Sequence, residues 1–218
     1  MSFSFIMLLL LGHSGPNLPI QGTDTVTKVV HDTVYIDRSR EWTKVFGFTH
    51  HSPDHDSVWH KPVQFYISKP NCSALATDFY YGDWRPSCNG MTDELLKLAT
   101  TDDKDLRPFY RWCLSMTIKI SDGCLGEATG APARRYAEKF PKEFFEYMDA
   151  DTTGNKYIQW TETIHYSGYD GTEEYRTDVS KKLTVTMLAN CKDCDDKLKK
   201  RIEKFAKDCF QIPLLKDK

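Results

Sequence analysis

The sequence predicts a mainly α-helical fold, a helical bundle of about six helices preceded by a small N-terminal β-hairpin or extended segment. From residue 91 to the end of the chain, apolar residues recur every three or four positions, which is the period of an amphipathic helix. Before residue 91 the apolar residues alternate, or lie between Pro, Gly and Asn, which is typical of strands and loops. The 218 residues are 40% hydrophobic and 28% charged, which is an ordinary composition for a globular protein.

The clearest helical signal lies in the C-terminal third of the chain. Its apolar stripe consists of Val179, Leu183, Met187, Cys191, Cys194, Leu198, Ile202, Phe205 and Cys209. The spacing predicts one helix, or two helices that meet near "NCKDC", with Lys, Asp and Glu on the opposite, solvated face. Earlier helices are predicted at "MTDELLKLA" with Thr92 as N-cap, "DLRPFYRWCLSMTIKI" with Asp105 as N-cap, "APARRYAEKF" and "PKEFFEYM".

The part before the helical domain (91–218) divides into a signal-like apolar segment (1–14), an extended spacer (15–40) and a small β or irregular portion (41–90). Two strands are predicted at "WTKVFGFT" (42–49) and "PVQFYIS" (62–68), because both are rich in β-branched and aromatic residues. Residues 69–90 predict irregular structure. The aromatic residues of "DFYYGDW" are either an exposed binding patch or a buried junction between strands and helices, and we favour burial.

An apolar run stands near the N-terminus. Residues 5–12, "FIMLLLLG", are too few to span a bilayer as a helix and fit the central region of a signal peptide, although "MSFS" before them lacks Lys and Arg. "LLLLGHSG" resembles the lipobox of bacterial lipoproteins, with His13 at the position of the lipidated Cys, so we expect no lipid anchor and no membrane span in the mature chain. The alternative is that this run begins a buried strand or helix. We predict an exported protein that is periplasmic, bound to the cell envelope or secreted.

Seven cysteines and a net charge of −2 constrain the compartment and the partners. An exported protein could form up to three disulfides with one thiol left over, whereas a cytosolic protein would keep mostly buried thiols. Cys191 and Cys194 form a C-x-x-C, which fits a redox pair, half a zinc site or a local disulfide. Both lie on the apolar stripe, which favours buried structural cysteines. The net charge excludes a general nucleic-acid binder.

Residues 151–162, "DTTGNKYIQWTE", contain oxygen ligands at the spacing of a calcium loop. Ligand positions 1, 3, 5, 7 and 12 are occupied by Asp151, Thr153, Asn155, Tyr157 through its carbonyl, and Glu162. Together with the helix predicted before it, the segment resembles one EF-hand, and this resemblance implies calcium. Lys156 stands where an EF-hand has Gly, and the sequence has no second loop to pair with it. The alternative is a structural turn, for which "TTGN" is sufficient.

A second candidate site is the polar loop "HHSPDHDSVWH", residues 50–60. Its predicted ligands are His51, His55 and His60, because dense imidazole and carboxylate groups bind zinc or a similar ion. If the ion keeps an open coordination position, His60 and Asp56 are the first candidates for proton transfer. The spacing fits no helical metal motif and Pro53 indicates a loop, so the alternative is a solvated loop without metal.

These observations predict an exported, non-enzymatic binding or interaction protein of a bacterial cell envelope, whose partner is a protein or a glycan. The alternative is a metal-dependent enzyme or a calcium-stabilised module that uses the loop at 50–60 or the loop at 151–162. A third hypothesis is an inert domain stabilised by disulfides. The chain has no Gly-rich phosphate loop, nucleophile elbow or H-E-x-x-H motif, which weakens the enzyme hypothesis without removing it.

Overall fold

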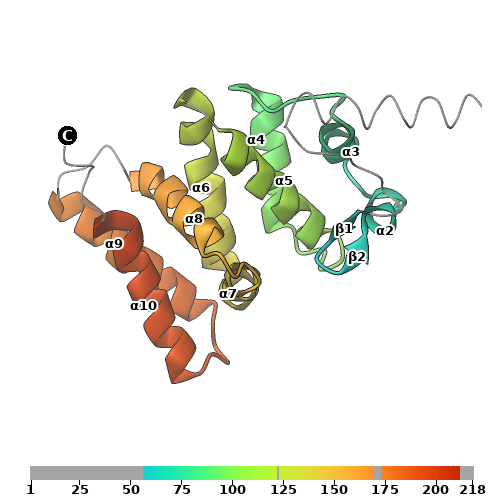
Figure 1. Cartoon of the computed structure of the whole chain (residues 1–218). Helices are drawn as coiled ribbons and strands as arrows, with labels where there is room; N and C mark the ends of the chain where they lie inside the picture. The colour runs from blue at the N-terminus through green and yellow to red at the C-terminus, as the bar shows by residue number, and fades with distance from the viewer. Residues whose placement is uncertain (1–55, 122, 169–172, 212–218) are drawn as a thin grey trace, which may run out of the picture. The chain divides into compact units, whose positions relative to one another are not determined.

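The computed structural model describes residues 56–121, 123–168 and 173–211, which all belong to the compact unit Asp37–Lys218. The predicted signal-like segment, the spacer, the strand at 42–49 and residues 50–55 of the histidine loop lie outside the described residues. Within them the predicted fold class is confirmed, because the chain is mainly helical and carries a small antiparallel hairpin near its N-terminal end (Figure 1).

The elements follow one another without a further strand in the described part of the chain. In order they are β1 (Ser57–Val58), β2 (Lys61–Pro62), α2 (Val63–Ile67), α3 (Ala74–Tyr81), α4 (Gly90–Lys97), the 3-10 helix η1 (Leu98–Thr100), α5 (Arg107–Ile120), α6 (Gly123–Lys139), α7 (Pro141–Asp149), α8 (Asn155–His165), the 3-10 helix η2 (Tyr166–Gly168), α9 (Glu173–Ala189) and α10 (Asp196–Gln211). The stripe predicted at the C-terminus is therefore shared by two helices, as one of its alternatives requires.

The hairpin and α2 correct the prediction for residues 62–68. β1 lies inside the segment that was expected to be a polar loop, and β2 follows directly after that segment. The predicted second strand is wrong: α2 occupies it, and its buried residues Val63 and Tyr66 are three apart, as on one face of a helix. The Tyr66 hydroxyl donates to the backbone oxygen of Val58 at 2.7 Å, which attaches α2 to the hairpin.

Residues 69–90, predicted to be irregular, contain a further helix. α3 begins after Ser73 and ends at Gly82, whose φ of 76° is the left-handed conformation that Gly adopts without steric cost. The expected burial of the aromatic residues in this stretch is confirmed for Phe79 and Tyr80, which are 0% and 1% exposed.

The predicted C-terminal helices are present, but two of their capping residues differ. Asn89, and not Thr92, caps α4, because its Oδ1 accepts a hydrogen bond from the backbone nitrogen of Thr92 at 3.0 Å. Asp103, and not Asp105, accepts from the backbone nitrogen of Leu106 at 3.1 Å before α5. In α4 the side chain of Asn89 thus satisfies a free amide of the first turn, whereas Asp103 holds the residue directly before α5.

Two hydrophobic cores share α5. The larger core lies among α5, α6, α7, α8, α9 and α10 and contains Leu114, Trp160 and Phe205. The smaller core lies among the hairpin, α2, α3, α4 and α5, and the rings of Tyr66 and Phe109 stack in it at 5.5 Å. Figure 1 shows the α9–α10 pair on one side of α6 and α8, and the hairpin with α2 and α3 beyond α5 on the other.

Candidate ligand-binding site

Residues 151–154 form a short turn between α7 and α8, and residues 155–162 belong to α8. Asp151 Oδ2 accepts from the backbone nitrogen of Lys156 at 2.8 Å, and Oδ1 accepts from the nitrogen and the hydroxyl of Thr153 at 3.1 and 2.7 Å. These hydrogen bonds, that from Lys156 first, hold the pKa of Asp151 below its ordinary value. Gly154 takes a left-handed φ of 74°, which is the role the turn alternative gives it.

This turn does not bring the predicted calcium ligands together. α8 begins at Asn155, so Glu162 lies seven residues further along the helix, roughly 10 Å along its axis. The backbone oxygen of Tyr157 accepts from the Thr161 hydroxyl inside α8, and both carboxylate oxygens of Asp151 already accept hydrogen bonds. The geometry favours the structural turn, and calcium binding stays a prediction.

Of the predicted zinc ligands, His60 lies within the described residues, whereas His51 and His55 do not. His60 is exposed in the turn of the hairpin, with its ring centroid 5.3 Å from that of Trp59. Asp56 accepts a hydrogen bond from a tyrosine hydroxyl of α3 at 2.8 Å. In the part of the chain that the structure describes, no group of three His, Cys, Asp or Glu converges as a metal site, and zinc binding stays a prediction.

Two cysteine pairs lie at disulfide distance within the described ranges. Cys88–Cys124 joins the segment before α4 to the start of α6, and Cys191–Cys194 lies in the turn between α9 and α10. Both cysteines of the C-x-x-C are buried, at 3% and 7% exposed, which confirms their expected burial, and their distance fits the local disulfide among the alternatives. The free thiols belong to Cys72, Cys113 and Cys209.

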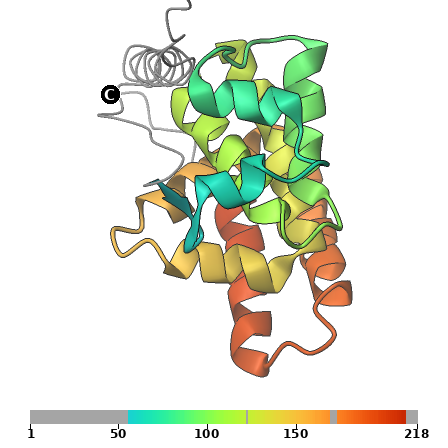
Figure 2. The same ribbon diagram turned by 90° about the vertical axis from the view of Figure 1, so that its right-hand side faces the viewer.

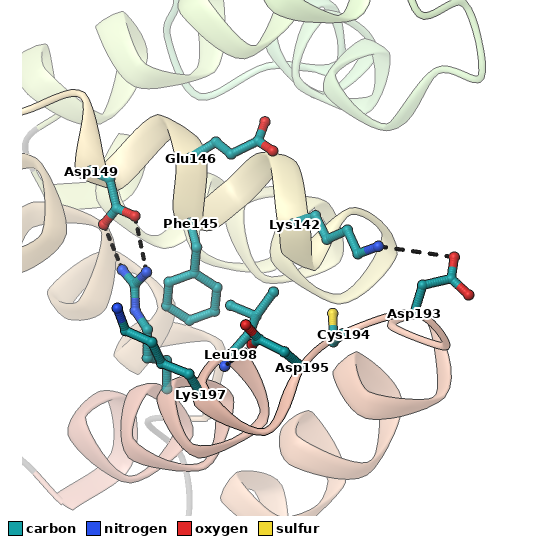
Figure 3. A pocket seen from close by; sticks show the side chains of 10 residues that line it. Lys142, Phe145, Glu146, Asp149, Asp193, Cys194, Asp195, Lys197 and Leu198 are labelled. Carbon is teal, nitrogen blue, oxygen red and sulfur yellow. Dashed lines mark hydrogen bonds and ion pairs between the residues drawn. The ribbon is translucent and has the colours of Figure 1, made fainter.

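A recess of about 380 Å³ lies between α7 and the start of α10, lined among others by Lys142, Phe145, Asp149, Asp193 and Arg201, and we call it the α7–α10 groove (Figure 3). Arg201 donates through Nη1 and Nη2 to the two oxygens of Asp149 at 2.9 and 2.5 Å, which lowers the pKa of Asp149. Lys142 lies 3.9 Å from Asp193. Carboxylates outnumber cations along this groove, so it offers no net attraction to an anion.

A second recess, of about 260 Å³, lies where the hairpin meets α5 and α7, and we call it the Arg111 pocket. Its lining residues include Trp59, Tyr66, Pro108, Arg111 and Glu143, together with Lys61, Lys104 and Glu146. Figure 2 shows the hairpin in front of the helices and close to α7, and the ring centroids of Trp59 and Tyr147 lie 6.0 Å apart. Three elements distant in sequence therefore meet at this pocket.

The guanidinium of Arg111 is buried against aromatic rings, and the residue is 2% exposed. Its Cζ lies 4.4 Å from the ring centroid of Trp59 and 4.1 Å from that of Tyr147. The two ring centroids lie 6.0 Å apart, so the directions from Cζ to the two rings are nearly perpendicular. The rings therefore lie on two adjacent sides of the guanidinium. Nη1 donates to the Tyr136 hydroxyl at 3.0 Å and lies 3.5 Å from the backbone oxygen of Glu143.

The other two nitrogens of Arg111, Nε and Nη2, have no hydrogen-bond partner among the described residues. The tyrosines around Arg111 supply no negative charge at neutral pH, because burial raises the pKa of Tyr66 and Tyr136 to about 12 and also raises the pKa of Tyr147. A buried cation without a matching anion costs on the order of several kcal/mol of desolvation free energy.

Arg107, one helical turn earlier on α5, shows what Arg111 lacks. Its residue is also 2% exposed and its Nε likewise makes no hydrogen bond with the described residues, but this Nε lies at ion-pair distance, 3.2 Å, from Oε2 of Glu143. Its Cζ lies 3.8 Å from the ring centroid of Phe140. The carboxylate of Glu143 thus pairs with Arg107, and only its backbone oxygen faces Arg111.

The hairpin turn that carries Trp59 is strained. Trp59 and His60 have φ angles of 50° and 66°, the only positive values at non-Gly residues in the described part of the chain. Such a turn normally uses Asn-Gly, and the left-handed conformation costs other residues roughly 1–2 kcal/mol each. This turn sets the Trp59 ring against Arg111, and strained backbone of this kind gathers at ligand sites.

No local sequence pattern predicts the Arg111 pocket. Arg107 and Arg111 flank Phe109 and Tyr110, on the helix whose apolar face is predicted to be buried. A cation beside a buried face needs a partner, and this is the signal in the sequence that points toward the site. Its aromatic neighbours come from other elements, so the pocket itself becomes visible only in the fold.

Comparison with protein-family models, with curated proteins and with solved structures finds no match for this chain. No helix in the described ranges is long and apolar enough to cross a bilayer. The class of protein therefore rests on the fold and the site, which define a helical domain with a buried cation at the edge of a small pocket.

Proposed function

We propose that the chain is an exported, non-enzymatic binding protein of a bacterial cell envelope, and that the Arg111 pocket binds a small anionic ligand. The apolar run at residues 5–12 and the two cysteine pairs at disulfide distance support export. Trp59, Tyr66 and Pro108 give the pocket ring surfaces, and five charged side chains supply polar groups beside them, so it can hold both parts of an amphiphilic ligand. The described residues that line the pocket include no Ser, Cys or His, which favours binding over nucleophilic chemistry.

One observation carries this proposal, namely that the buried Arg111 has two donors without a partner among the described residues. Buried polar groups in folded proteins are nearly always hydrogen-bonded, and each exception needs an explanation. An anion that accepts from Nε and Nη2 would supply both the missing hydrogen bonds and the missing charge.

The test is the thermal unfolding of the full chain in the sodium salts of chloride, acetate, benzoate and phosphate, at one ionic strength and neutral pH. A ligand at a hundred times its Kd stabilises the folded state by about 2.7 kcal/mol, which raises the melting temperature by several degrees. We expect at least one of the three test anions to produce such a rise over chloride. We expect the rise to be lost in Arg111→Lys, which keeps the charge but not the planar pair of donors.

Arg134→Lys is the matched control, because Arg134 pairs with Glu138 on the same helix at 2.9 Å and lines neither recess. This variant should keep the full response to the anion. The proposal is wrong if none of the three anions raises the melting temperature, or if the rise persists in Arg111→Lys.

A further inference from the structure

We infer that the ligand of the Arg111 pocket carries a single carboxylate on a small, flat, apolar body. This inference rests on the proposed function, because it names the class of ligand for the same site. It follows from the donors that are free, the walls of the pocket and the charges around it.

The free donors of Arg111 form one edge of its guanidinium. Nε–H and one N–H of Nη2 lie in the same plane and point in parallel, which matches the two oxygens of a carboxylate. The opposite donor, Nη1, is occupied by the hydroxyl of Tyr136. Trp59 and Tyr147 lie against two further sides, so the Nε–Nη2 edge, whose two nitrogens are buried, is the part of the guanidinium that lacks both an acceptor and a ring.

Three of the eight lining residues favour a ligand with a flat, apolar body. Trp59 and Tyr66 contribute aromatic surface and Pro108 an aliphatic ring, and the other five lining residues are charged. The volume of about 260 Å³ lies below the roughly 300–1,000 Å³ of drug-sized sites. The body of the ligand is therefore about the size of a single ring.

The charges around the pocket select a monoanion. Of the lining residues, Lys61, Lys104 and Arg111 are positive and Glu143 and Glu146 are negative, which leaves one net positive charge. A single carboxylate balances this charge, whereas the second charge of a phosphate would be repelled by Glu146.

The experiment is isothermal titration calorimetry of the full chain with sodium benzoate, acetate and inorganic phosphate at constant ionic strength and neutral pH. We expect benzoate to bind at one site, at least tenfold more tightly than acetate or phosphate. Arg111→Lys should weaken benzoate binding at least tenfold, whereas Arg134→Lys should leave the Kd unchanged.

Two variants at exposed positions keep the test decisive even if Arg111→Lys does not fold. Lys104→Gln should weaken benzoate binding two- to threefold, and Glu146→Gln should strengthen it by a similar factor, because the two changes alter the local charge in opposite directions. Equal effects of the same sign would overturn the assignment of the site.

The outcomes separate this inference from the proposed function. Tighter binding of phosphate than of benzoate overturns the carboxylate class but leaves an anion site at Arg111. Equal binding of acetate and benzoate overturns the flat, apolar body. If no anion binds in the calorimeter and none raises the melting temperature, the proposed function fails as well.

Discussion

The α7–α10 groove and the Arg111 pocket each hold an arginine against an aromatic ring, yet only the groove supplies that arginine with a carboxylate. In the groove, Arg201 lies with its Cζ 4.6 Å from the ring centroid of Phe145, and Asp149 accepts from both of its terminal nitrogens. In the pocket, Arg111 lies against two rings and meets no carboxylate among the described residues. The two arginines also differ in solvent access: the Arg201 side chain is 36% exposed, and Arg111 is 2% exposed.

This difference separates an arginine that serves the fold from one that is suited to a ligand. An exposed ion pair such as Arg201–Asp149 stabilises a fold by no more than about 1 kcal/mol, because water solvates both partners when the pair breaks. A buried guanidinium gains far more from an anion, since water cannot replace it. Arg201 and Asp149 thus show within this chain the type of contact that we assign to the ligand of Arg111.

Removal of a cross-link should give the largest effect. Cys88 and Cys124 are 36 residues apart and enclose α5, the helix that carries Arg111, whereas Cys191 and Cys194 are three apart beside the groove. By loop-closure entropy, the double variant Cys88→Ser/Cys124→Ser should lose about 3–4 kcal/mol of unfolding free energy, and Cys191→Ser/Cys194→Ser about 2 kcal/mol or less. Urea unfolding measures both losses. Equal losses would mean that the two cysteine pairs stabilise the fold equally, and that the region of Arg111 is no better cross-linked than the groove.

The next effect in size tests the hydrogen bond between Arg111 and Tyr136. Tyr136→Phe removes the hydroxyl that accepts from Nη1 and leaves a third nitrogen of the buried guanidinium without a good acceptor. We expect a loss of about 1–3 kcal/mol in the free energy of urea unfolding, the usual cost of an unsatisfied buried donor.

A double-mutant cycle with Arg111→Met separates this cost from the loss of packing. In the Arg111→Met background the donor is absent, so Tyr136→Phe should cost clearly less than in the wild type. The same cost in both backgrounds would mean that the hydrogen bond contributes nothing, and that Arg111 is less tightly held than its contacts indicate.

The start of α8 contacts Tyr147, whose ring lies against Arg111. The Nζ of Lys156 lies 3.1 Å from the backbone oxygen of Tyr147 and 3.8 Å from the centroid of its ring. Asp151→Ala removes three hydrogen bonds at the start of α8 and should cost about 1 kcal/mol, as for a helix cap. The loss in thermal unfolding should be equal in EDTA and in calcium.

Glu162→Ala is the control for the calcium prediction, because Glu162 is exposed on α8 and should change the unfolding free energy by less than about 0.5 kcal/mol. A calcium-dependent rise in melting temperature that both variants abolish would instead establish the EF-hand-like site. A zinc-dependent rise that His60→Ala abolishes would do the same for the histidine loop.

Most helices from residue 90 onward could be predicted because their apolar faces repeat over many turns, as along Val179 to Cys209. The helix α8 was not predicted, because its first residues match the spacing of a calcium loop. α2 could not be predicted, because a five-residue segment rich in aromatic and β-branched residues fits a strand and a short helix equally well. In the fold, the hydrogen bond from Tyr66 to Val58 holds this helix against the hairpin. The caps differ for a similar reason. Asn89 and Thr92 are both good capping residues, and only the path of the chain selects one.

The candidate sites predicted from the sequence depended on spacing, and spacing alone does not determine distance. The residues at 151–162 match an EF-hand by count, but the early start of α8 carries Glu162 away from Asp151. The Arg111 pocket has the opposite character, because Trp59, Arg111 and Tyr147 share no local pattern and meet only through packing. A motif search finds the first kind of site and misses the second.

The smallest effect should come from the exposed pair in the α7–α10 groove, and its dependence on pH sharpens the comparison. The hydrogen bond from Arg201 lowers the pKa of Asp149 in the folded state. The pair therefore contributes its full stability above the ordinary carboxyl pKa, near 3.8. This contribution is lost as the pH falls through the lower pKa that Asp149 has in the folded state. Because both side chains are at least 36% exposed, a double-mutant cycle of Asp149→Asn and Arg201→Gln in urea should give only a few tenths of a kcal/mol at pH 7. The coupling energy between the two side chains should shrink as the pH falls through the folded-state pKa of Asp149. A coupling well above 1 kcal/mol, or one that does not change with pH, would mean that water does not weaken this pair, and the contrast with the buried Arg111 would lose its physical basis.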